Sequence, residues 1–80
     1  MMNKYETITT TTCPTNGSIV EIHIVIVSCH AIMVEDLQEF LKENLTSYHE
    51  VLADKLHKRF GGKQILTGFH HGVWITTERG

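Results

Sequence analysis

The chain has 80 residues, of which 41% are hydrophobic and 20% charged, the proportions of an ordinary globular protein. Seven basic and nine acidic residues give a formal net charge of −2 at pH 7, which disfavours a protein that binds nucleic-acid polymers through their phosphates. A chain of this length buries a core that is only marginally sufficient to stabilise a fold. We therefore expect a single domain over residues 1–80 that depends on self-association, metal or disulfides for further stability.

Two features bear on the cellular setting. Cys13 and Cys29 lie in an N-terminal half that has no signal-peptide pattern. The longest apolar run, residues 19–27, is about half the length needed to span a bilayer and is interrupted by Glu21 and His23. We therefore expect a cytoplasmic protein with free thiols and no membrane partner.

The N-terminal region combines a β-prone segment with a turn. Residues 1–12 are rich in threonine and predict an edge strand, a frayed tail being the alternative. Residues 13–18, CPTNGS, contain the residue types that fix or permit turn dihedrals and lie between two β-prone segments. They predict a hairpin connection.

Residues 19–27, IVEIHIVIV, predict the central strand because they are almost wholly β-branched. Both faces of this strand are apolar: one carries Val20, Ile22, Ile24 and Ile26, and the other carries Ile19, Glu21, His23, Val25 and Val27. A single helix covers only one face of a sheet. We therefore predict that Ile19, Val25 and Val27 form an interface with a second copy of the chain.

Residues 34–60 predict a long amphipathic helix. Apolar residues recur every three or four positions, at Val34, Leu37, Leu41, Leu45, Tyr48, Leu52, Leu56 and Phe60. One continuous helix would be about 40 Å long, whereas a domain of this size is about 30 Å across. We favour one helix, and the alternative is a break at residues 44–47, where Ser47 and Glu50 have the spacing of a capping box.

Residues 64–77, QILTGFHHGVWITT, predict a C-terminal hairpin with its turn at residues 70–72, the alternative being one long strand. Alternation along the segment places Phe69 on one face and Trp74 on the other. The expected fold is α+β, with element order ββαββ or ββαβ: a small antiparallel sheet with one long helix packed on one face.

Histidine is the one compositional excess, with six residues. We assign His49 and His57 to a solvated helix face. The residue types that bind zinc occur at His23, Cys29, His30, His70 and His71. Since no C-x-x-C or H-E-x-x-H motif accompanies them, we expect neither a metal nor a cofactor.

One set of polar and aromatic residues is suited to stacking on a ring and neutralising a negative charge. These residues are His23, Lys63, Phe69, His70, His71 and Trp74, with Arg79 a further cation. The sequence has no acid–base pair near a nucleophile or metal motif, which makes an enzyme the less favoured interpretation. We expect a small non-catalytic homo-oligomer that sequesters or senses an anionic or nucleotide-like ligand at subunit interfaces; the alternative binding function is that of an inhibitor or adaptor of a partner protein.

The order of elements, a helix between two hairpins, is similar to that of the tunnelling-fold enzymes of pterin and purine metabolism. That resemblance implies sheets that join into oligomeric barrels, with an enzyme of this kind acting between subunits as a further alternative. The zinc-binding histidines and the substrate-anchoring glutamate of that family have no residue-by-residue match here, so the resemblance assigns no site residue.

Overall fold

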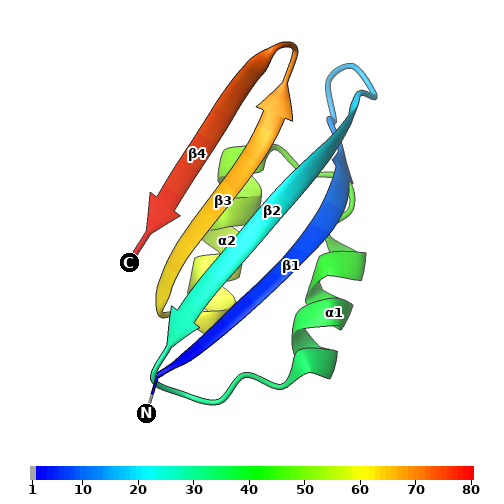
Figure 1. Ribbon diagram of the computed structural model, residues 1–80. Helices are drawn as coiled ribbons and strands as arrows, with labels where there is room; N and C mark the ends of the chain where they lie inside the picture. The colour runs from blue at the N-terminus through cyan, green and yellow to red at the C-terminus, as the bar shows by residue number, and fades with distance from the viewer. Residues whose placement is uncertain (1) are drawn as a thin grey trace.

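The computed structural model describes residues 2–80 and contains a four-stranded sheet with two helices on one side of it (Figure 1). The elements are β1 (Asn3–Thr12), β2 (Ile19–Ser28), α1 (Val34–Glu43), α2 (His49–Phe60), β3 (Lys63–His70) and β4 (Val73–Arg79). The predicted α+β class is confirmed. The element order is ββααββ, so the predictions of ββαββ or ββαβ were wrong in the number of helices.

The strands follow chain order across the sheet, β1-β2-β3-β4, and each neighbouring pair is antiparallel. The predicted first hairpin is present, because β1 and β2 pair from Asn3↔Ser28 to Thr12↔Ile19. Its loop is closed by two backbone hydrogen bonds, from the Cys13 amide to Ser18 and from the Gly17 amide to Cys13. The N-terminal strand prediction is thus confirmed for residues 3–12, and Met1 lies outside the described residues.

The second hairpin turns at His71 and Gly72, whose φ angles of 48° and 85° suit the type I′ turns that join twisted antiparallel strands. Residues that pair across such a turn lie on the same face of the sheet. Phe69 pairs with Trp74, so these two side chains share a face. The assignment of Phe69 and Trp74 to opposite faces was wrong, because it carried the alternation straight through the turn.

The core lies between the helices and one face of the sheet. In Figure 1, α1 lies beside β1, and α2 crosses behind β2 and β3. The fully buried hydrophobic side chains come from β2, β3 and α2: Ile22, Ile24, Ile26, Leu52, Ala53, Leu56 and Leu66. The predicted inward face of the central strand is therefore confirmed.

The helical region is interrupted, which overturns the prediction of one continuous helix over residues 34–60. α1 ends at Glu43, and α2 begins at His49. Between them, the backbone turns aside to meet the end of β1, where the Thr12 amide donates to the carbonyl of Leu45 over 2.6 Å. The break falls at the predicted alternative position, but Ser47 does not cap α2, because its hydroxyl donates to the carbonyl of Asn44 at 3.1 Å.

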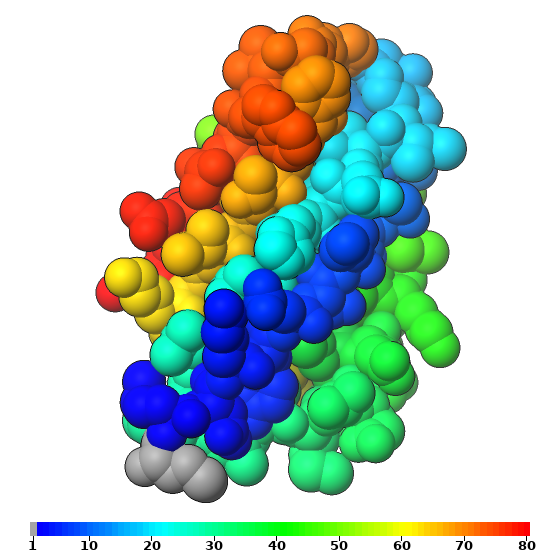
Figure 2. All heavy atoms as spheres, viewed as in Figure 1, coloured from blue at the N-terminus to red at the C-terminus, as the bar shows by residue number. Residues whose placement is uncertain are grey.

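The opposite face of the sheet is uncovered by any described part of the chain, and Figure 2 views the molecule from this side. Its exposed apolar side chains are Ile8, Ile19, Phe69 and Trp74. We call this surface the open face. Among residues 2–80, no helix is long and apolar enough to cross a membrane.

Candidate functional site

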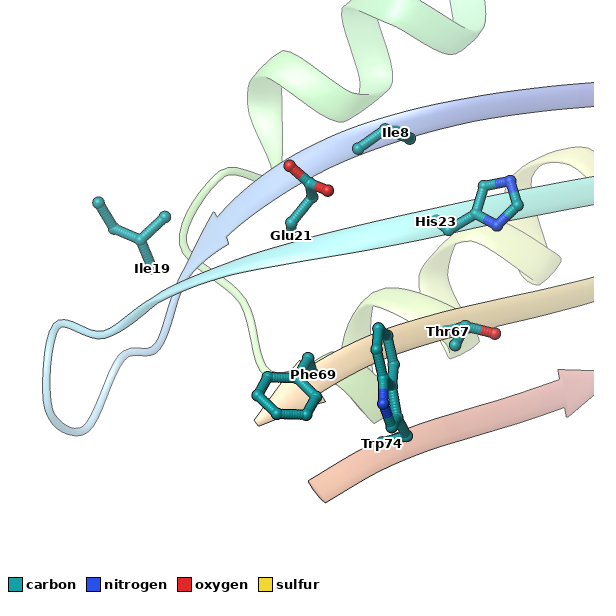
Figure 3. Close-up of a pocket in the computed structure, with 7 residues that line it drawn as sticks. All are labelled: Ile8, Ile19, Glu21, His23, Thr67, Phe69 and Trp74. Carbon is teal, nitrogen blue, oxygen red and sulfur yellow. The ribbon is translucent and has the colours of Figure 1, made fainter. Parts of the chain in front are cut away.

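The open face carries a cavity of about 510 Å³ near the ends of the two hairpins (Figure 3). All four strands contribute to it, because its lining residues are Ile8, Ile19, Glu21, His23, Thr67, Phe69 and Trp74. A cavity of this volume is within the range that holds small organic ligands.

Two aromatic rings form one wall of the cavity. The rings of Phe69 and Trp74 meet edge to face, with centroids 4.8 Å apart and planes at 61°. Trp74 nevertheless remains 69% exposed. Aromatic faces left open to solvent inside a cavity favour stacking on the flat ring of a ligand.

The opposite wall is polar and lies on β2. Glu21 and His23 are two positions apart, so both project from the open face (Figure 3). His23 lies 3.5 Å from the carboxylate of Glu6 on the neighbouring strand, and both are half exposed. The Glu21 carboxylate has no hydrogen-bond or ion-pair partner within residues 2–80, so it is available to accept N–H donors from a ligand.

The structure divides the predicted ligand-binding residues among several places. His23, Phe69 and Trp74 come together in the open-face cavity. Lys63 lies at the far end of β3, beside Glu78 and Arg79, and His71 lies in the hairpin turn. His70 lies beneath the sheet, on the helix-covered side, in a second cavity.

This second cavity, of about 410 Å³, contains a residue that the sequence interpretation missed. It is lined by Tyr48, His49, Glu50, Val51, His70 and Ile75. The assignment of His49 to a solvated face was wrong, since only 5% of its surface is exposed. The available signal was the spacing of His49, Leu52 and Leu56 at i, i+3 and i+7, which places all three on one face of a helix.

The environment of His49 opposes its protonation. Burial lowers the pKa of the imidazole below its ordinary 6.5, and the nearby His70 lowers it further, while the carbonyl of Leu66 and the charge of Glu50 act in the opposite direction. A buried group with a perturbed pKa in a cavity is a candidate for function.

The lowered pKa predicts an acid-sensitive fold. Unfolded His49 takes up a proton below about pH 6.5 and folded His49 only at a lower pH, so between these values the unfolded state binds more protons. We expect the contribution of His49 to be fully present above pH 6.5, to fall as the pH drops below it, and to be lost once the pH passes the folded pKa. Urea titrations at pH 5 to 8 in metal-free buffer measure this, and His49→Leu should show a shallower pH slope. An equal slope in both proteins would contradict the prediction.

Comparisons with known proteins identify a structure of similar fold but do not assign the chain to a family. No protein-family model matches the sequence, and no curated protein matches it. The structure is similar to the crystal structure of the archaeosine synthase QueF-Like in the apo form, with a TM-score of 0.68 and 13% sequence identity, over 98% of this chain and 90% of that chain. At this identity the likeness concerns the fold alone.

Proposed function

We propose that the protein is a non-catalytic homo-oligomer that binds a small nucleotide-like ring in the open-face cavity. The observation that carries the proposal is the exposed Trp74 ring, which stands beside Phe69 and across the cavity from Glu21. Such a site offers stacking from one side and a hydrogen-bond acceptor from the other. The open face also has the apolar character of a surface that another protomer covers, so the ligand would lie at a subunit junction.

The charges around the cavity narrow the kind of ligand. Glu6 and Glu21 place carboxylates on the open face, while Lys63 lies at the distant end of β3. A negative group is therefore disfavoured beside Glu21, whereas a ring edge with adjacent N–H donors is favoured. We infer that the ring, rather than a phosphate, is what the cavity recognises.

Fluorescence titration tests this proposal directly, because Trp74 is the only tryptophan in the chain. Guanosine presents two neighbouring N–H donors on its ring edge and adenosine does not, so guanosine should quench the fluorescence at lower concentration. Calorimetry should give an affinity for guanosine at least about tenfold lower in Trp74→Ala, as expected when a base loses its stacking partner.

Two further variants distinguish a specific effect on ligand binding from a general loss of structure. Glu21→Gln should reduce the preference for guanosine over adenosine, and His71→Ala, which alters an exposed residue of the turn, should leave both affinities unchanged. The proposal fails if neither nucleoside quenches the fluorescence, or if Trp74→Ala binds guanosine as well as the wild type does.

A second candidate function is an enzyme of the tunnelling-fold kind. It is supported by the fold likeness to the archaeosine synthase and by the buried His49, whose pKa is perturbed. Turnover of a bound nucleoside by the wild type, and its loss in His49→Gln, would favour this alternative over simple binding.

A further inference from the structure

The second cavity ends at two imidazoles that meet beneath the sheet. The rings of His49 and His70 have centroids 5.4 Å apart and planes at 62°. His49 Nδ1 and His70 Nε2 are both buried from solvent, and neither has a hydrogen-bond partner within residues 2–80. Leaving a buried polar atom without a hydrogen-bond partner is destabilising. Two of them in one place indicate a shared binding role.

The hydrogen bond made by His49 Nε2 determines whether His49 Nδ1 carries a hydrogen or a lone pair. His49 Nε2 lies 3.2 Å from the carbonyl oxygen of Leu66, and a carbonyl only accepts. Nε2 therefore carries the hydrogen, and Nδ1 presents a lone pair. Metal-binding histidines are oriented in the same way, with one nitrogen donating to a backbone carbonyl and the other left for the metal.

Gly68 provides the space into which both nitrogens project. A Cβ atom at this position would lie 3.1 Å from His49 Nδ1 and 3.3 Å from His70 Nε2. Both nitrogens therefore border one small volume that any larger residue at position 68 would fill. A single small group there is able to contact both.

We propose that His49 Nδ1 and His70 Nε2 bind a divalent transition-metal ion such as Zn²⁺. A zinc–nitrogen bond is about 2.0–2.1 Å long, shorter than a hydrogen bond of about 2.9 Å. A bare ion therefore suits nitrogens whose surface a water molecule does not reach. Within residues 2–80, no third His, Cys, Asp or Glu side chain completes the set, so a bound ion would take its remaining ligands from water or from a small molecule in the cavity that both histidines line.

This site is separate from the open-face cavity, and the metal proposal does not depend on the ring-binding function. It also departs from the sequence-based expectation of no metal, which rested on the absence of C-x-x-C and H-E-x-x-H motifs.

Metal titration of the full chain tests the proposal. Chelator-treated protein should develop the visible absorption of bound Co²⁺, and Zn²⁺ should displace it. His70→Phe keeps an aromatic ring beside His49 but removes the ligand nitrogen, and we expect it to weaken binding by about tenfold or more. The matched control is His71→Phe, which removes the neighbouring exposed imidazole and should change the affinity less than twofold.

Side-chain ¹⁵N spectra of wild-type histidines provide a second measurement, which holds even if His70→Phe does not fold. Zn²⁺ should shift His49 Nδ1 and His70 Nε2 and leave His23 unchanged. The proposal is overturned if no Co²⁺ absorption develops at millimolar metal, if His71→Phe weakens binding as much as His70→Phe, or if the shifted nitrogens belong to other histidines.

Discussion

Val25→Glu is expected to dissociate the proposed homo-oligomer into protomers. Val25 lies on the open face of β2 next to Val27, with which we predict it to form the interface, and it is half buried even in the single chain. A glutamate there would have to bury a charge in the proposed interface, which is costly. We expect the dissociation constant to rise about 100-fold or more, which corresponds to about 2.7 kcal/mol.

Analytical ultracentrifugation over a concentration series measures this change. Val34→Glu is the matched control, because it makes the same substitution at an exposed position in the first turn of α1, away from the open face. A negative charge at a helix N-terminus is well tolerated. If Val25→Glu and Val34→Glu associate equally well, the open face is not the interface.

Gly61 and Gly62 lie between α2 and β3, and we expect Gly62→Ala to lower the free energy of unfolding more than Gly61→Ala does. Gly62 has a φ of +73°, and a Cβ atom there would lie 2.6 Å from the carbonyl oxygen of Val27. That oxygen belongs to the backbone of the central strand, so it has little freedom to move away. The substitution therefore combines backbone strain with a steric clash inside the sheet.

The adjacent Gly61 supplies the control. Its φ is also positive, at +66°, but a Cβ atom there would meet nothing within 4 Å. Gly61→Ala should therefore show the strain alone, and Gly62→Ala should lower the free energy of unfolding by about 1–3 kcal/mol more. Urea unfolding of both variants gives this difference directly. Equal stabilities would mean that the strand carbonyl moves aside without cost.

The strands were the most predictable part of the fold, because their signals are local. The β-branched run of residues 19–27 and the turn residues of CPTNGS each indicate their structure without reference to the rest of the chain. The helix limits at Val34 and Phe60 were also predictable, since acidic residues open the region and Gly61 closes it with a positive φ.

The helix break depends on a tertiary contact that the sequence does not display. Leu45 continues the apolar period, yet its carbonyl leaves the helix to accept the amide of Thr12 at the end of β1. Periodicity records which residues are apolar, and it does not record which backbone groups find partners elsewhere.

The candidate sites were predictable only in their chemistry. The sequence indicated that Trp74, Phe69 and His23 were suited to a ring-bearing ligand, and the structure brings these three into one cavity. Alternation along residues 64–77 already put His70 on the face opposite Phe69. The sequence did not indicate that Lys63 lies far from the cavity, because its position depends on the strand register. The sequence shows which side chains are present, whereas the connections and register of the strands determine which of them meet in one site.

Native mass spectrometry of the freshly purified wild-type protein tests the central claim most directly, because it reports the number of protomers and any retained ligand together. We predict an assembly of two or more chains that carries a ring-bearing small molecule, and we predict that Trp74→Ala assembles without it. A ligand-free monomer at the chain mass of 9.1 kDa, at micromolar concentration, would contradict both the assembly and the binding function.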